Sequence, residues 1–251
     1  MYFQPTPSAH QDFNLEHDER IKAFASDEEF LRVSNLWRSM ALERKYMNNF
    51  SWLGRPLIQF PGDVMAVQEL IFAIRPTLVI ETGIAHGGSL ILSASLLKMN
   101  NIKGRVIGID IDIREHNYSA IKAHDHSDII TLYQGSSVDS KIISQIKSSI
   151  EPNDTVMVFL DSNHTHEHVL AELNAYSAMV SKGSYLVVFD THVEDMPDSY
   201  IWADRPWGKG NNPKTAVHEW LPNNSNFTID KDLDRKILLT SAPDGFLYKL
   251  A

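Results

Sequence analysis

The chain has 251 residues, of which 43% are hydrophobic, and this is enough for one large α/β domain with an N-terminal extension. Its formal net charge of −9 disfavours a nucleic-acid partner, because phosphate backbones are bound by clustered Lys and Arg. The absence of cysteine excludes disulfides and thiolate metal sites, and the absence of a run of roughly 20 apolar residues argues against a membrane span.

The N-terminal part of the chain is predicted to be helical and separate from the main domain. Residues 1–14 lack periodicity and are predicted to be a mobile tail, whereas apolar residues recur at helical spacing from about 15 to 49. A break at Gly54-Arg55-Pro56 divides the chain into an extension, 1–54, and a domain, 55–251. Because the polar tail does not resemble a secretory signal, we expect a cytoplasmic protein, and the helical extension favours a homo-oligomer.

The rest of the chain alternates between apolar runs and helical patterns. Val, Ile and Leu dominate the predicted buried strands at 78–81, 106–110, 129–133, 156–161 and 185–190. Helices are predicted at about 63–74, 89–99, 115–123, 138–149, 165–180 and 213–221. Strands that alternate with helices indicate a doubly wound, Rossmann-like α/β sheet.

Two further strand-like runs, 226–231 and 235–241, follow with only a short turn between them. Because no helix fits into that turn, these runs predict a C-terminal antiparallel hairpin, which residues 246–249 could extend. The expected sheet is therefore mostly parallel with an antiparallel end.

Four of the five parallel strands are predicted to end in a carboxylate: Glu81, Asp110, Asp161 and Asp190. In open α/β sheets, ligands bind beyond the carboxyl ends of the strands, where the strand order reverses. Asp is also common at strand ends because it suits turns. A set of four nevertheless indicates a binding site at this edge of the sheet.

A loop with three glycines joins the first strand to the next helix. Gly83 and Gly87 would let the backbone approach a ligand, and Ser89 could cap a helix whose N–H groups attract an anion. The loop lacks the GxGxxG of dinucleotide enzymes, and Glu81 would repel a pyrophosphate. S-adenosylmethionine suits the loop better, because its ammonium can pair with Glu81 while its carboxylate meets the helix N-terminus.

The next two strand ends offer further contacts to such a cofactor. Asp110 can accept hydrogen bonds from both ribose hydroxyls, and Asp112 competes with it for this role. Ser136 and Ser137 follow the third strand, where they could contact adenine or form a plain turn.

Asp161 and Asp190 are predicted on neighbouring strands, so their carboxylates could share one cation. Two carboxylates favour a hard ion such as Mg²⁺, for which His192 is a candidate third ligand. A metal that holds a substrate hydroxyl lowers its pKa, and His164 could then remove the proton, so His164 and Asp161 are the candidate catalytic residues. Zinc is the alternative, because His164 and His168 could form a site with Asp161.

The segment from Thr191 to Pro213 is too long for an ordinary connection. Its aromatic rings, hydrogen-bond donors and glycines would suit a lid over a polar substrate, although an ordered surface loop with buried tryptophans would have a similar composition. The candidate lid residues are Trp202, Arg205, Trp207, Asn211 and Asn212.

Together these segments resemble the cephalosporin hydroxylase / rhamnosyl O-methyltransferase family of class I S-adenosylmethionine-dependent methyltransferases. The similarity runs from about Arg55 to Leu250 and is carried by ETGIAHGGS, VIGIDIDIR, GSSVD, LDSNHTHEHVLAEL, GSYLVVFDTH and RPWGKGNNPKTAV. The resemblance implies metal-assisted methylation of a hydroxyl on a sugar, glycoconjugate or small natural product. It also implies Asp161 and Asp190 at the metal, and it places His164 where catechol O-methyltransferase carries a catalytic lysine.

One position departs from this family. Related sequences often have Glu-Asp or Asp-Asn as consecutive ligands at the fifth strand end, whereas Phe189 precedes Asp190 here and cannot bind metal. The site would then use His192, Asn163 or water. Phe189 also leaves open a methyltransferase-like protein that binds a ligand without catalysis. A nicotinamide-dependent oxidoreductase on the same kind of sheet is a further alternative.

Overall fold

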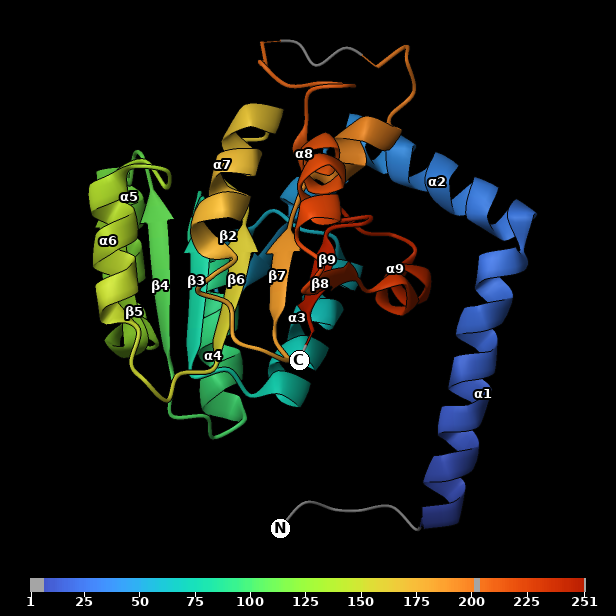
Figure 1. Ribbon diagram of the computed structural model, residues 1–251, viewed down its shortest axis with the longest axis horizontal. Coiled ribbons are helices and arrows are strands. Elements are labelled where there is room, and N and C mark those ends of the chain that lie inside the picture. The colour runs from blue at the N-terminus through green and yellow to red at the C-terminus, as the bar shows by residue number, and fades with distance from the viewer. Residues whose placement is uncertain (1–6, 201–203, 251) are drawn as a thin grey trace.

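The computed structural model describes residues 7–200 and 204–250 and contains a seven-stranded sheet (Figure 1). The strands are β3 (Leu78–Thr82), β4 (Arg105–Asp110), β5 (Ile130–Gln134), β6 (Val156–Leu160), β7 (Tyr185–Val188), β8 (Phe227–Ile229) and β9 (Phe246–Lys249). Their order is β5-β4-β3-β6-β7-β9-β8. The first five strands in this order are parallel to one another, and β9 pairs antiparallel with both β7 and β8.

Helices cover both faces of the sheet. One face carries α3 (Pro61–Ile74), α4 (Gly88–Met99) and α5 (Glu115–Lys122), and the other carries α6 (Ser140–Ser149), α7 (His166–Tyr176) and α8 (Pro213–Trp220). Every residue of β3 and β6 is buried, as expected for apolar strands that are covered on both sides. The predicted doubly wound α/β sheet is confirmed. Its strand order reverses between β3 and β6, which places the predicted ligand crevice at their carboxyl ends.

The predicted strand at 235–241 is wrong. Residues Lys231–Ile237 form helix α9, which begins where the Asp230 carboxylate accepts a hydrogen bond from the Leu233 backbone N–H at 3.0 Å. Leu233 and Ile237 then pack against the core. The antiparallel partner of β8 is instead β9, the segment that was expected only to extend the hairpin.

The N-terminal extension contains α1 (Pro7–Ser26), α2 (Glu28–Glu43), the short 3₁₀ helix η1 (Tyr46–Asn49) and the hairpin β1 (Phe50–Trp52) and β2 (Arg55–Leu57). Since α1 begins at Pro7, the part of the expected tail from residue 7 onward is helical, while residues 1–6 lie outside the described chain. Figure 1 shows α2 near the carboxyl ends of the strands and α1 extending along the side of the molecule past α9.

The predicted boundary between residues 54 and 55 falls inside the turn of the β1–β2 hairpin. This hairpin packs on α4, where the Trp52 indole N–H donates a hydrogen bond to the Ser95 hydroxyl at 2.9 Å. The hairpin therefore ties the extension to the domain.

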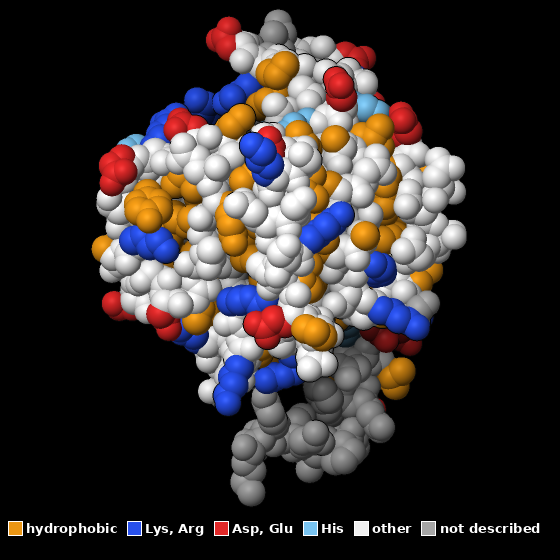
Figure 2. Space-filling model, turned by 60° about the vertical axis from the view of Figure 1, so that its left-hand side comes forward, with side chains coloured by type: hydrophobic (Ala, Val, Ile, Leu, Met, Phe, Trp, Pro, Cys, Tyr) orange, Lys and Arg blue, Asp and Glu red, His pale blue; other side chains and the backbone are white. Residues whose placement is uncertain are grey.

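On the side of the molecule that lies to the left in Figure 1, acidic and basic side chains are scattered among uncharged ones (Figure 2). None of the helices in residues 7–200 and 204–250 is both long enough and apolar enough to cross a membrane.

Candidate active site

A cavity of about 710 Å³ lies at the carboxyl ends of β3, β4, β6 and β7. Its lining includes three of the four predicted strand-end carboxylates, Asp110, Asp161 and Asp190, together with Gly83 of the loop after β3 and Ser89 in the first turn of α4. The volume is within the range of ligand-binding clefts, which is roughly 300–1,000 Å³. The structure thus places these side chains around one space at the reversal point of the sheet.

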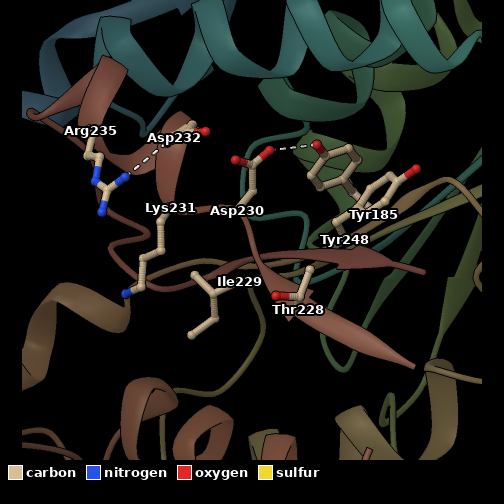
Figure 3. Close-up of a pocket in the computed structure, with 8 residues that line it drawn as sticks. All are labelled: Tyr185, Thr228, Ile229, Asp230, Lys231, Asp232, Arg235 and Tyr248. Atoms are coloured by element: carbon tan, nitrogen blue, oxygen red, sulfur yellow. Dashed lines mark hydrogen bonds and ion pairs between the residues drawn. The ribbon is translucent and has the colours of Figure 1, made fainter. Parts of the chain in front are cut away.

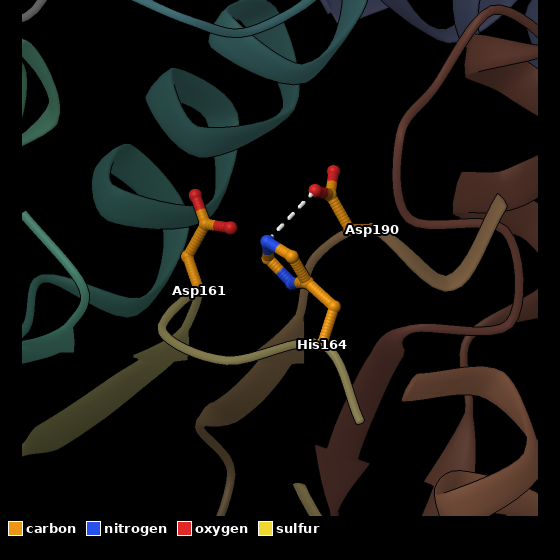
Figure 4. A group of neighbouring side chains, drawn as sticks. All are labelled: Asp161, His164 and Asp190. Carbon is orange, nitrogen blue, oxygen red and sulfur yellow. Dashed lines mark ion pairs between the residues drawn. The ribbon is translucent and has the colours of Figure 1, made fainter. Parts of the chain in front are cut away.

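Asp161, His164 and Asp190 form a group whose potential ligand atoms all lie within 4.8 Å of one another (Figure 4). The His164 Nε2 atom is 3.2 Å from Asp190 Oδ2. Burial raises the pKa of Asp161, and the nearby carboxylate of Asp190 raises it further. Asp190 has a positive φ of 57°, a strained conformation that Asp tolerates better than most residues. A divalent cation would relieve the repulsion between the two carboxylates.

His192 is only 2% exposed and lines the cavity, but it is not part of this group. Its Nδ1 atom lies 3.1 Å from the Ser241 carbonyl oxygen and 3.7 Å from Asp190 Oδ1. Burial lowers the pKa of His192, although the charge of Asp190 opposes this shift. The structure therefore brings His164, rather than the predicted His192, together with the two aspartates.

The alternative zinc site is not assembled in the structure. The His168 Nε2 atom lies 3.0 Å from the hydroxyl oxygens of both Ser137 and Ser162, and 3.6 Å from a carboxylate oxygen of the buried Glu172. His168 thus belongs to a polar cluster beneath the cavity wall and does not join His164 and Asp161.

Glu81 differs most from its predicted placement. It is 1% exposed and does not line the cavity, because the central strand directs it beneath the start of α4. The Ser89 hydroxyl donates to its Oε1 atom, whereas Oε2 is buried without a hydrogen-bond partner. Burial raises the pKa of Glu81 to about 8, although the hydrogen bond from Ser89 opposes this shift. Glu81 is therefore connected to the cavity only through its hydrogen bond with Ser89.

Gly83 and Gly87 have positive φ values of 79° and 80° and are required for packing. A Cβ atom on Gly83 would lie 2.0 Å from the Asp161 carbonyl oxygen, and one on Gly87 would lie 2.4 Å from Ile121 Cδ1. Gly83 lines the cavity and Gly87 does not. These two glycines therefore accommodate neighbouring parts of the fold, a role that the local sequence does not reveal.

Asp110, and not Asp112, lines the cavity. Its Oδ2 atom accepts a hydrogen bond from the Ile84 backbone N–H and its Oδ1 atom accepts one from the Asp112 backbone N–H, both at 3.0 Å. These bonds hold the carboxylate at the strand end while each oxygen keeps further acceptor capacity. Asp112 is exposed.

Ser136 and Ser137 do not line the cavity. Ser137 is 4% exposed, and its carbonyl oxygen accepts a hydrogen bond from the Tyr176 hydroxyl at 2.7 Å. These contacts give Ser137 a place in the polar cluster around His168.

The predicted lid divides into two parts. Arg205 and Trp207 line the cavity, where the Trp207 ring meets the His164 ring edge to face at 4.7 Å and the Arg205 guanidinium lies 5.1 Å from the Trp207 ring centre. Asn211 and Asn212 do not line it. Asn212 caps α8, and Asn211 accepts a hydrogen bond from the His166 backbone N–H at 2.9 Å. Trp202 lies outside the described residues.

Two features of the cavity wall were not predicted from the sequence. Leu42, Lys45, Met47 and Asn48 of the N-terminal extension line the cavity. The buried Asp63 side chain accepts hydrogen bonds from the Thr240 hydroxyl, from the Ser241 backbone N–H at 2.9 Å and from the Ser241 hydroxyl at 2.8 Å. Because the Ser241 carbonyl contacts His192, Asp63 fixes the loop behind the site.

A second cavity, of about 540 Å³, lies beside β8, β9 and α9 (Figure 3). Its charged side chains are paired at its wall. The Tyr185 hydroxyl donates to Asp230 at 2.7 Å, Arg235 donates to Asp232 at 3.0 Å, and Lys231 donates to Asp244. These pairs leave it a weaker candidate site than the cavity at the strand ends.

Comparisons with known proteins agree with the fold. A family model for rhamnosyl O-methyltransferase/CmcI matches residues 44–250. The rhamnosyl O-methyltransferase of Mycobacterium tuberculosis is 29% identical over 213 residues, which cover 81% of this chain and 82% of the relative. The enzyme of the same name from Mycobacterium leprae is 28% identical over 203 residues, which cover 80% and 84%.

Solved structures share the same fold. CmcI with Mg and S-adenosylmethionine has a TM-score of 0.56 at 22% identity, over 81% of this chain and 78% of that chain. The O-methyltransferase TomG from Streptomyces achromogenes has a TM-score of 0.54 at 13% identity, over 87% and 90%. With the family model matching from η1 to the end of β9, the chain belongs to the rhamnosyl O-methyltransferase/CmcI family.

Proposed function

We propose that this protein is an S-adenosylmethionine-dependent O-methyltransferase that uses a divalent cation to methylate a hydroxyl of a sugar, glycoconjugate or small natural product. The names of its relatives support the reaction, and the Mg and S-adenosylmethionine in CmcI support the two cofactors. The observation that carries the proposal is that one cavity contains both Asp110 and the Asp161–His164–Asp190 group.

The residues around the cavity fit the proposed methyl donor. Asp110 has acceptor capacity for ribose hydroxyls, and the N-terminus of the 12-residue helix α4 offers N–H groups to a carboxylate. Ser89 lies at the wall between the cavity and Glu81, whose unpartnered buried Oε2 is the type of atom that a ligand ammonium stabilises. Glu81 would then become negatively charged when the cofactor binds.

The donor set also fits a divalent cation. Asp161 and Asp190 would hold it, and when bound it would orient the acceptor hydroxyl and lower its pKa. The position of His164 suits either of two roles, acceptance of the hydroxyl proton or ligation of the cation. Trp207 packs on His164 and, with Arg205, would exclude water from the acceptor.

Isothermal titration with S-adenosylmethionine, with and without Mg²⁺, tests the proposal. We expect binding to the intact chain and a loss of affinity of at least about tenfold in Asp110→Ala, because the ribose acceptor is removed. Asp112→Ala is the matched control, since its exposed side chain does not line the cavity. No binding at millimolar ligand would defeat the proposal, and methyl transfer that survives Asp161→Ala would defeat its metal component.

We also propose a cytoplasmic location and a homo-oligomeric state. The homo-oligomeric state is supported by exposed apolar side chains on α2, where Leu36 is 51% exposed and Met40 is 43% exposed. Light scattering on the purified chain measures the oligomeric state directly.

A further inference from the structure

We infer that His164 is a ligand of the cation rather than the base that removes the hydroxyl proton, and that the site consequently prefers a first-row transition-metal ion such as Mn²⁺ to Mg²⁺. The inference rests on the proposed function only in assuming that Asp161 and Asp190 bind a divalent cation. It specifies the third protein ligand and the class of metal.

The His164 ring is oriented toward the two aspartates. Figure 4 shows the imidazole lying between the Asp161 and Asp190 carboxylates, with a ring nitrogen directed at the space between them. That nitrogen, Nε2, lies 3.2 Å from Asp190 Oδ2, and the potential ligand atoms of all three residues fit within 4.8 Å. The Trp207 ring, 4.7 Å away, packs on the imidazole and limits its rotation. One nitrogen cannot bind a cation and accept a proton at the same time.

The neighbours of the two aspartates are directed elsewhere. Phe189 is 2% exposed and packs edge to face against Phe159 in the core, so it supplies no ligand atom. The Asn163 Oδ1 atom accepts hydrogen bonds from the backbone N–H and the hydroxyl of Thr165, at 2.9 and 2.8 Å. The His192 Nδ1 atom lies closer to the Ser241 carbonyl oxygen, at 3.1 Å, than to Asp190 Oδ1, at 3.7 Å. His164 is therefore the side chain that the fold presents to the two carboxylates.

The chemistry of this donor set determines the metal preference. Mg²⁺ takes oxygen ligands almost exclusively, whereas imidazole nitrogen suits the later first-row ions, and Mn²⁺ accepts both carboxylate and imidazole. Two carboxylates and one imidazole nitrogen thus favour Mn²⁺ over Mg²⁺ more strongly than an all-oxygen site would. Replacing the imidazole by an oxygen donor should reduce this preference.

Electron spin-echo envelope modulation of the full chain loaded with Mn²⁺ tests the ligand directly. We expect ¹⁴N modulation from a bound imidazole, loss of that modulation in His164→Gln, and its retention in the matched control His166→Gln. The control is apt because His166 Nδ1 contacts the Thr215 hydroxyl at 2.8 Å and its Nε2 contacts Glu219 at 3.1 Å. Labelling the unsubstituted chain with ¹⁵N-histidine should replace the ¹⁴N signal, which identifies histidine without any substitution.

Competition between Mn²⁺ and Mg²⁺ gives the second measurement. The ratio of their affinities should fall by about tenfold in His164→Gln and stay unchanged in His166→Gln. Bound Mn²⁺ without ¹⁴N modulation, or modulation that persists in His164→Gln, would overturn the inference. If S-adenosylmethionine binds while the modulation is absent, only this inference fails. If the modulation is present and no S-adenosylmethionine binds, the ligand assignment stands and the proposed function fails.

Discussion

The buried carboxyl of Glu81 gives the protein a stability that depends on pH. Its pKa is about 8 in the folded chain, against an ordinary value of 4.5, because burial disfavours the charged form. The protonated form is therefore the one that the fold accommodates. Below about pH 4.5 its contribution to stability is fully present, and it is lost progressively as the pH rises from there to about 8.

We expect Glu81→Gln to reduce this loss, since the amide keeps an acceptor for Ser89 and cannot ionise. The measurement is the free energy of urea unfolding without cofactor at pH 6 and at pH 8.5. The unsubstituted chain should lose more stability between these pH values than the variant does. Glu43→Gln, at an exposed position of α2, is the control and should behave like the unsubstituted chain. Equal losses in all three proteins would show that Glu81 is not the group responsible.

For single residues, the sequence predicted which side chains lie together in the cavity but not the surroundings of each one. Parallel strands end at one edge of a sheet, so the meeting of Asp110, Asp161 and Asp190 followed from the strand pattern alone. The burial of Glu81 did not follow, because it depends on the position of α4 above the strand. The need for glycine at residue 83 likewise comes from the Asp161 carbonyl, 78 positions away in the chain.

Among the elements, the helix at Lys231–Ile237 shows why local pattern was insufficient. The run of apolar residues around Ile237 resembles a strand, yet Asp230 is also a helix cap, and the sheet position beside β7 is taken by β9. Competition between two segments for one sheet position is decided by tertiary packing, which a local pattern does not record. The five parallel strands were predictable because each is apolar and separated from the next by a helix or turn signal.

The loop after α9 is held to α3 by Asp63, which accepts three hydrogen bonds from Thr240 and Ser241. We expect Asp63→Ala to lower the free energy of unfolding by about 2–4 kcal/mol, because three buried donors lose their acceptor. The control on the same helix is Glu69→Ala, which removes an ion pair with Lys236 whose side chains are partly exposed, and should cost less than about 1 kcal/mol. Urea unfolding curves of both variants measure the difference. Similar losses in the two variants would contradict a special role for Asp63.

For the molecule as a whole, the N-terminal extension is part of the active site rather than an addition to it. Arg38 of α2 is 7% exposed and donates to Asp195 at 3.2 Å, and residues between Leu42 and Asn48 line the cavity. In contrast, α1 contacts α2 and α9 and contributes no residue to the cavity lining. Two parts of the extension should therefore differ in their effect on ligand binding.

Two truncations separate these parts. Removal of residues 1–26 deletes α1, and we expect an affinity for S-adenosylmethionine within about threefold of the full chain, since α1 lies away from the cavity. Removal of residues 1–49 deletes the wall formed by Leu42, Lys45, Met47 and Asn48, and should weaken binding by at least about tenfold. Titration calorimetry measures both affinities, with circular dichroism to establish that each protein is folded. Arg38→Gln, which loosens α2 from Asp195 without any deletion, should weaken binding in the same direction. Full affinity in the folded shorter chain and in Arg38→Gln would mean that the cavity closes without the extension, and that the domain begins near residue 55 as its sequence pattern predicted.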